Sequence, residues 1–224
     1  MNAAGACMKR GLPMTRVRLT LLALLLGGCS AINLGSSPDA PRTIWLLSAV
    51  PAAAPAGAAR PAGVLLVDKP EARAGFDTPR MAYSRQPLAI DYYTRSEWAD
   101  VPARMLQPLI VQTLAQGGTW TAVLPAPNPG RADVRLTTNV LELVHDLSAG
   151  EPGLVRLRLR AVFTDVVDRR VLATREFAAV EPAASANAEG YAAADDRADA
   201  RVLAGLAAFT AETFAPAPAR VGRR

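Results

Sequence analysis

The sequence predicts an α+β fold: a mostly antiparallel sheet with two main helices packed against it, in a single domain. Three observations predict it. Short apolar or alternating segments, which are typical of strands, recur between residues 43 and 181. A helical pattern interrupts them after residue 100, and an alanine-rich helical segment over 188–214 follows the last strand.

Four short strands are expected before the first helix, over 43–50, 63–68, 81–85 and 88–94. The second of them (GVLLVD) is continuously apolar, which predicts a buried strand. Gln86 and Pro87 predict a turn between the last two strands. An alanine- and proline-rich loop over 51–61 separates the first two.

The first helix has clear start and stop signals. Asp100 is a good N-cap, and Pro102 lies in the first turn, where its missing N–H costs nothing. Pro108 should kink the helix, and the Gly117-Gly118 pair should end it. We therefore expect one amphipathic helix in this segment.

Long strands dominate the second half of the domain. Apolar and polar residues alternate over 134–140, which predicts a half-buried strand. The alternation then shifts by one residue, which predicts a β-bulge near Val140-Leu141. The segment over 154–165 alternates most cleanly, and we expect 171–181 to return as its hairpin partner.

The closing helix over 188–214 is expected to bury one face. Its buried stripe should contain Tyr191, Ala198, Val202, Leu206, Phe209 and Thr213. The early turns also carry Asp195, Asp196 and Asp199. We interpret these three acids as a favourable interaction of negative charge with the N-terminal end of the helix dipole.

The first 28 residues predict a signal peptide that is removed. Four basic residues and no acidic one accompany an apolar core over 17–26, which is shorter than the about 20 residues needed to cross a membrane. The core ends in Leu26-Gly27-Gly28-Cys29, which matches the bacterial lipobox. In that motif the chain is cut between Gly28 and Cys29, and the cysteine is acylated. The alternative is an ordinary signal peptide followed by an incidental cysteine.

Cleavage would leave a nearly neutral chain that cannot form a disulfide. The formal net charge of the whole chain is +5, but four basic residues leave with the signal peptide. Cys7 leaves as well and Cys29 carries lipid, so no thiol pair remains. We expect a lipidated tether over 29–42, the folded domain over 43–214 and a disordered tail over 215–224. Three methionines are alternative start positions: Met1, Met8 and Met14.

Several stretches of the sequence resemble the auxiliary lipoproteins of ABC-type transport systems, a family that includes the paraquat-inducible C-type lipoproteins. The most specific are FDTPRMAY over 76–83, IDYY over 90–93 and EWADVPARML over 97–106. The lipobox, an early WLL segment over 45–47 and the GYAA start of the last helix over 190–193 are similar as well. The resemblance covers nearly all of the chain that follows the signal peptide.

The resemblance implies a component that works beside an ABC permease, its ATPase and an MCE-domain (mammalian-cell-entry) protein. Such systems move phospholipids or other hydrophobic molecules between the inner and outer membranes, and some relatives form homo-oligomeric rings. Ser30 stands where a lipoprotein retained in the inner membrane would carry aspartate. Lipoprotein sorting then implies anchoring in the outer membrane through acyl chains on Cys29, facing the periplasm. We expect no cofactor and no nucleic-acid partner.

Enzyme activity and a metal site are not expected. His145 is the only histidine, and the neighbouring Asp146 would point to the other side of a strand, where it cannot orient the imidazole. The sequence contains no G-x-S-x-G elbow and no glycine-rich phosphate loop. We therefore expect His145 to be a surface or strand-end residue.

Arg156, Arg158 and Arg160 form the most prominent charged stripe, because they share one face of a predicted strand. They could meet acidic lipid headgroups or a negatively charged partner. Alternatively, the stripe is a solvated face that pairs with acids such as Glu176 and Glu142 on neighbouring strands.

Aromatic residues offer a second candidate surface. Tyr92 and Tyr93 must point to opposite faces of a strand, so we expect one of them to be exposed and to face a partner or lipid. Trp98 directly precedes the predicted helix start, and we expect it to be buried in the core.

Two other functions remain open from the sequence. One is a structural or assembly lipoprotein of the envelope without a transport role, which would not co-purify with an ATPase, a permease and an MCE protein. The other is a carrier that binds lipid in its own cavity, and lipid extracted from the unacylated domain would support it.

Overall fold

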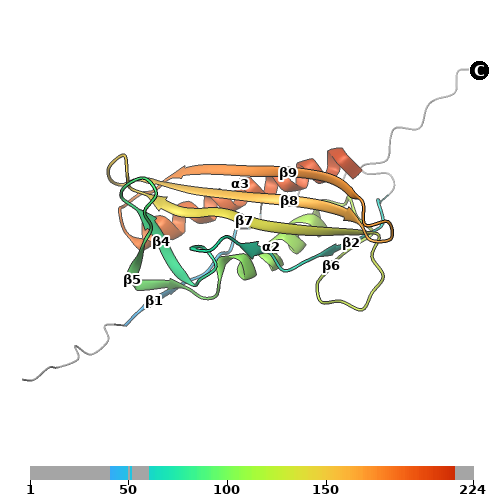
Figure 1. Ribbon diagram of the computed structural model, residues 1–224, viewed down its shortest axis with the longest axis horizontal. Helices are drawn as coiled ribbons and strands as arrows, with labels where there is room; N and C mark the ends of the chain where they lie inside the picture. The colour runs from blue at the N-terminus through green and yellow to red at the C-terminus, as the bar shows by residue number, and fades with distance from the viewer. Residues whose placement is uncertain (1–40, 50, 52–60, 215–224) are drawn as a thin grey trace, which may run out of the picture. The chain divides into compact units, whose positions relative to one another are not determined.

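The computed structural model describes residues 41–49, 51 and 61–214 (Figure 1). The predicted signal peptide, lipobox and tail, and most of the tether and of the 51–61 loop, lie outside the described residues. The elements in chain order are β1 (Thr43–Trp45), β2 (Val64–Val67), β3 (Glu71–Ala72), β4 (Arg80–Ser84), β5 (Asp91–Trp98), α2 (Pro102–Gln116), β6 (Ala122–Pro125), β7 (Val134–Asp146), β8 (Leu154–Asp165), β9 (Val171–Pro182) and α3 (Ala188–Phe214).

In the part of the chain that the structure describes, nine strands form one sheet and two helices accompany it. This confirms the α+β class, but the sheet is mixed rather than mostly antiparallel. The three longest strands, β7, β8 and β9, pair antiparallel in chain order, and β4 pairs antiparallel with β5. Every other pair is parallel: β1 with β5, β6 with β2, and β2, β3 and β4 with β7. Because parallel neighbours cannot be joined by a tight turn, segments distant in sequence lie side by side along β7.

The predicted β-bulge is present in β7. Val140 pairs with Leu159 of β8 and Glu142 pairs with Arg158, so the register shifts between these two positions. The extra residue reverses the faces beyond it. Glu142 therefore lies on the same face of the sheet as Arg158, and His145 turns toward the buried face, where its side chain is inaccessible to solvent.

Both helices lie on one side of the sheet, and in Figure 1 they are behind the plane of the strands. The core between them contains Trp98 and Tyr191, whose rings meet edge to face with centroids 5.5 Å apart. The burial of Trp98 is thus confirmed. The inward residues of β8 are all buried, as the alternation predicted: Val155, Leu157, Leu159, Ala161 and Phe163.

Helix α2 begins at Pro102, and its N-cap is Val101. The prediction that Asp100 is the N-cap is therefore wrong. The Asp100 carboxylate accepts a hydrogen bond from the N–H of Val101 at 2.7 Å and pairs with Arg104 four residues on. It therefore supports the first turn through a side-chain ion pair instead of capping it. Gly117 is the C-cap, as expected, and Pro108 lies inside the helix, where a kink stays a prediction.

Helix α3 has the predicted bounds, and most of the predicted stripe faces the core. Thr213 is the exception, because it is exposed and its hydroxyl donates to the Phe209 carbonyl. Thr210 is buried in its place, one turn after Leu206. Within the described residues, neither helix combines the length and the apolar character needed to cross a membrane.

Strand β1 is shorter than predicted, because the chain leaves β5 after Trp45 and turns toward α3. The backbone N–H and the hydroxyl of Ser48 both donate to the Asp196 carboxylate of α3, at 3.1 and 3.0 Å. The turn between β4 and β5 is longer than the predicted Gln86-Pro87 pair and occupies residues 85–90.

Candidate functional site

The outer face of the sheet, opposite the helices, carries a ladder of ion pairs built on β7, β8 and β9. The three arginines of β8 that were predicted to share a face do lie on it, and each contacts an acid on a neighbouring strand. The pairs are Arg156 with Asp146 (2.7 Å), Arg158 with Glu142 (3.9 Å) and Glu176 (3.1 Å), and Arg160 with Glu176 (2.6 Å). The pairing expected for a solvated sheet face is therefore the one the structure shows.

These ion pairs hold their acids in the charged form. The guanidinium groups of Arg160 and Arg158 lower the pKa of Glu176 by hydrogen bonding to its carboxylate. The pKa of Asp146 falls to about 2, because the Ser148 hydroxyl and then Arg156 donate to it. An anionic headgroup would have to displace these acids to reach the arginines.

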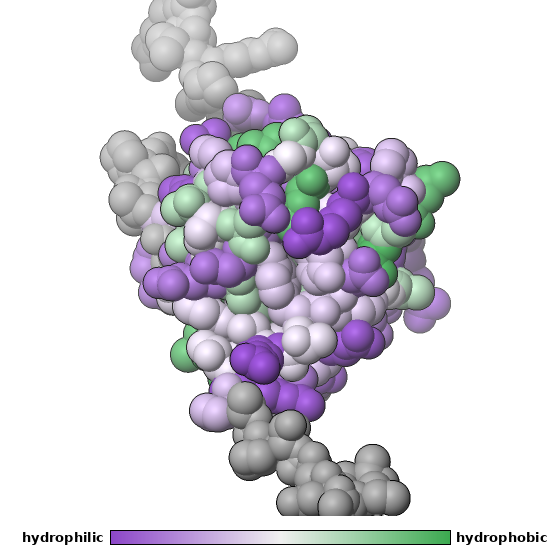
Figure 2. Space-filling view, turned by 90° about the vertical axis from the view of Figure 1, so that its left-hand side faces the viewer, coloured by the Kyte–Doolittle hydropathy of each residue, from purple (hydrophilic) through white to green (hydrophobic). Residues whose placement is uncertain are grey.

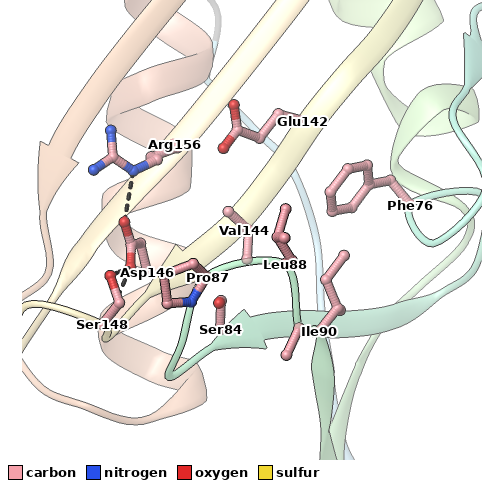
Figure 3. Close-up of a pocket in the computed structure, with 11 residues that line it drawn as sticks. Phe76, Ser84, Pro87, Leu88, Ile90, Glu142, Val144, Asp146, Ser148 and Arg156 are labelled. Carbon is pink, nitrogen blue, oxygen red and sulfur yellow. Dashed lines mark hydrogen bonds and ion pairs between the residues drawn. The ribbon is translucent and has the colours of Figure 1, made fainter.

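A hollow of about 390 Å³ opens on the outer face at one end of the ladder. Figure 3 shows Arg156 and Asp146 on one side of it and Phe76 on the other, with Val144 and Leu88 between them. The remaining lining residues come from the end of β4, from the 85–90 turn, from β7 and from the turn that follows β7: Ser84, Pro87, Ala89, Ile90, Glu142 and Ser148.

Tyr92 and Tyr93 lie on opposite faces of β5, as predicted, but neither is fully exposed. The Tyr92 hydroxyl donates to the Gly75 carbonyl at 3.0 Å, and the Arg80 guanidinium lies 3.7 Å from the centre of its ring. The expectation that one tyrosine would be exposed is therefore wrong, because each is covered by a partner. Tyr93 faces the helices and does not belong to the outer face.

His145 lies at the end of β7, as one of the two predicted alternatives had it, but the prediction of a surface position is wrong. Its side chain lies in the core, because the bulge in β7 turns it inward. Burial lowers its pKa, so the imidazole is neutral. The ring contacts the Pro152 carbonyl through Nε2 at 2.8 Å and the Tyr93 hydroxyl through Nδ1 at 2.9 Å. A neutral ring satisfies both when Nε2–H donates to the carbonyl and Nδ1 accepts from Tyr93.

This assignment makes Tyr93 and His145 a structural pair without free catalytic capacity. Burial raises the pKa of Tyr93 to about 12, so its hydroxyl stays a donor. Gly153 permits the arrangement, since its φ is +83° and a Cβ there would lie only 3.0 Å from the His145 Nε2.

We expect Tyr93→Phe to lower the free energy of unfolding by about 1–3 kcal/mol, because it leaves the buried His145 Nδ1 without a donor. Urea unfolding of the purified protein measures this loss. Tyr92→Phe is the matched control, since it removes the same hydroxyl from the opposite face and should cost under about 1 kcal/mol. Equal losses in the two variants would contradict a buried structural pair.

Two acids of α3 are buried, which the sequence interpretation missed. Asp195 and Asp199 are 0 % and 1 % exposed, and their carboxylate oxygens have no hydrogen-bond partner among the described residues. The helix-dipole interpretation is wrong for both, although it remains compatible with the partly exposed Asp196. The spacing Tyr191, Asp195, Asp199 places one residue per turn on the apolar stripe, and this signal was present in the sequence.

Desolvation raises the pKa of Asp195 and Asp199 well above the ordinary value, and negative charge nearby adds to the effect. The pair therefore retains protons that exposed aspartates would lose. In the described part of the chain, no three His, Cys, Asp or Glu side chains are grouped so that they could hold a metal ion.

The fold and the surface together define an α+β domain with a charged sheet face and an open hollow beside it. The sequence matches the family of ABC-type transport auxiliary lipoprotein components over residues 45–207. The chain therefore belongs to this family. It is a lipoprotein component that assists an ABC-type transport system, and the resemblance seen in the sequence is confirmed.

Two solved structures share the fold of this chain. Protein XCC0632 from Xanthomonas campestris is 26% identical, with a TM-score of 0.68, and the match covers 76% of this chain and 96% of that one. An uncharacterized protein shares the fold at 13% identity with a TM-score of 0.60, over 76% of this chain and 99% of its own. No curated protein matches the sequence.

Proposed function

We propose that this protein is held in the outer membrane by acyl chains on Cys29 and faces the periplasm. There it serves as the auxiliary component of an ABC transporter that works with an MCE-domain protein to move lipids or other hydrophobic molecules between membranes. The family match over 45–207 carries the proposal. The Leu26-Gly27-Gly28-Cys29 motif and Ser30 support the anchor and the outer-membrane destination.

The role is positional rather than catalytic. The only histidine is committed to structural hydrogen bonds with Tyr93 and Pro152. The one cysteine after the signal peptide is the acylation site. What the domain offers instead is a rigid sheet face that a transporter protein can bind.

The ion-pair ladder of Arg156, Arg158 and Arg160 is the docking surface in this proposal. Its arginine side chains are 41–49% exposed and Glu176 is 40% exposed, so a partner with a complementary mixture of charges can exchange contacts with them. Such charges set the partner, its orientation and the association rate more than the final affinity.

Affinity purification of the full-length lipoprotein from membranes, with mass spectrometry of the bound proteins, tests the function. We expect an MCE-domain protein together with an ABC permease and ATPase. Recovery of outer-membrane assembly proteins without any ABC component would support the structural alternative. Extracting lipid from the purified domain tests the carrier alternative, and an empty domain would count against it.

The docking surface is tested in the same experiment by Arg160→Glu, which places a second negative charge beside Glu176. We expect recovery of the transporter proteins to fall by about fivefold or more, because a like-charge contact opposes association. Arg175→Glu is the matched control: Arg175 pairs with Glu212 of α3, and the two arginines have side-chain exposures of 50% and 49%. If Arg160→Glu and the control behave alike, the ladder is not the docking surface, whereas the transport role is unaffected.

A further inference from the structure

The turn over 85–90 presents apolar side chains to solvent in a way that the transport role does not explain. Leu88 is 108 % exposed, the largest exposure among the described large hydrophobic residues, and Ile90 beside it is 41 % exposed. Pro87 is exposed as well. Leu88 and Ile90 line the hollow on the outer face, but both leave apolar surface open to solvent, and covering that surface is favourable.

The turn is held in a defined conformation. The Ser84 hydroxyl donates to the Gln86 carbonyl at 2.8 Å, and the Ser84 carbonyl accepts from the N–H of Leu147 at 2.7 Å. Leu88 has a φ of +65°, in the left-handed region that a leucine rarely adopts. Strain of this kind persists where the surrounding structure imposes it and is concentrated at functional sites.

We propose that the 85–90 turn contacts the phospholipid membrane that holds the acyl chains of Cys29, and that Leu88 enters the headgroup region. This inference rests on the proposed acylation of Cys29. It assigns to the domain a second, apolar membrane contact, which fixes the orientation of the sheet relative to the membrane.

The length of the tether permits this contact. The segment from Cys29 to Pro41 spans at most about 40 Å when extended. Thr43 pairs with Ser96, which lies about 20 Å along β5 from Ile90 at ~3.3 Å per residue. Figure 1 places the start of β1 and the turn between β4 and β5 at the same end of the domain. The acylated cysteine and Leu88 can therefore reach one membrane surface.

The charges around the turn favour an apolar contact over an electrostatic one. Arg85 pairs with Glu151 at 3.6 Å, so the turn presents no unpaired cation of its own. Figure 2 views this end of the domain and shows mostly hydrophilic residues with small, separate hydrophobic patches. A contact made by Leu88 and Ile90 should therefore be insensitive to salt and to anionic lipid.

One buried leucine strengthens membrane partition by about 10- to 150-fold, which is too little to bind a free domain durably. On a chain that is already anchored, the same contact is intramolecular, and its effective concentration is high. The turn thus acts as an orienting contact and not as an anchor.

The test uses the full-length acylated protein in neutral phosphatidylcholine vesicles, with a fluorophore on an introduced cysteine. Because Cys7 is removed and Cys29 is acylated, the cysteine that Gln86→Cys introduces is the single labelling site. We expect spin-labelled lipid to quench this fluorophore, and Leu88→Asp in the same chain to abolish most of the quenching. Val167→Cys is the matched control, because Val167 is 84 % exposed in the turn between β8 and β9 at the other end of β8 and should not be quenched.

The outcomes separate the two proposals. Vesicle flotation reports the anchor, and a chain that does not float contradicts the acylation of Cys29 and this inference together. A chain that floats without quenching at position 86 overturns the membrane contact alone. Quenching that Leu88→Asp leaves unchanged also overturns it. So does a fluorescence change at position 86 that needs a partner protein and occurs without vesicles.

Discussion

Replacing Cys29 with alanine is expected to move the protein from the membrane to the soluble periplasmic fraction. In the proposed processing, the Cys29 thiol receives the diacylglyceryl group, and the α-amine of Cys29 that cleavage frees is then acylated. One acyl chain binds a membrane with only about 10⁴ M⁻¹, whereas several chains make release very slow. Membrane retention is therefore expected to fall by at least about a thousandfold.

The variant must still be exported and its signal peptide cleaved, because otherwise the fractionation result cannot be interpreted. Residues 1–28 are therefore exchanged for an ordinary secretory signal, which ends in small residues and does not require cysteine. Sucrose-gradient fractionation then locates the protein. Retention of the Cys29→Ala chain in membranes would show that the domain is held by other contacts, and the lipobox interpretation would be wrong.

Ser30→Asp in the unaltered precursor is the matched variant for the destination. It keeps the acylated Cys29, so the protein should stay in membranes, but it introduces the residue that sorting rules associate with the inner membrane. We expect the protein to shift from outer- to inner-membrane fractions. An unchanged distribution would contradict the outer-membrane assignment without affecting the anchor.

Regular periodicity explains which parts of the fold were predictable from the sequence. β8 and α3 have the predicted bounds, because each maintains one period over many residues. The phase shift at Val140 predicted the bulge for the same reason. Short strands were less predictable, since β1, β4 and β5 obtain their bounds from the neighbours with which they pair.

Parallel pairing and the buried polar groups could not be obtained from local patterns. Which strand lies beside β7 is decided by contacts between segments far apart in the chain, so a mostly antiparallel sheet was the natural expectation. His145 could have been placed inside by applying the predicted bulge to the residues after it. Among the candidate surface residues, Arg156, Arg158 and Arg160 share one face, whereas Tyr93 lies on the other because neighbours on a strand alternate.

Asp195 and Asp199 lead to the second large effect, a stability that falls as pH rises. Burial raises the pKa of both carboxyl groups in the folded state, whereas the unfolded chain has ordinary values near ~3.9. The folded protein therefore binds more protons than the unfolded chain above about pH 4. The stabilisation is fully present below the unfolded pKa and is lost as pH rises through the folded pKa.

Linkage gives the size of this slope. Each group that stays protonated only in the folded state lowers the unfolding free energy by about 1.4 kcal/mol per pH unit. The two carboxyl groups interact, so we expect a combined slope of about 1–3 kcal/mol per pH unit from pH 5 upward. Urea unfolding at intervals from pH 5 to pH 8 measures it.

Asp195→Asn with Asp199→Asn tests the cause, because the amides match the carboxyl groups in shape but do not titrate in this range. The double variant should show a nearly flat pH dependence and should exceed the wild type in stability by several kcal/mol at pH 8, with the order reversed or equal near pH 5. Asp196→Asn is the control, since Asp196 is only partly buried and accepts hydrogen bonds from Ser48. If the double variant keeps the wild-type slope, the pH dependence arises from other groups, and the two carboxyl groups are satisfied by water in the folded protein.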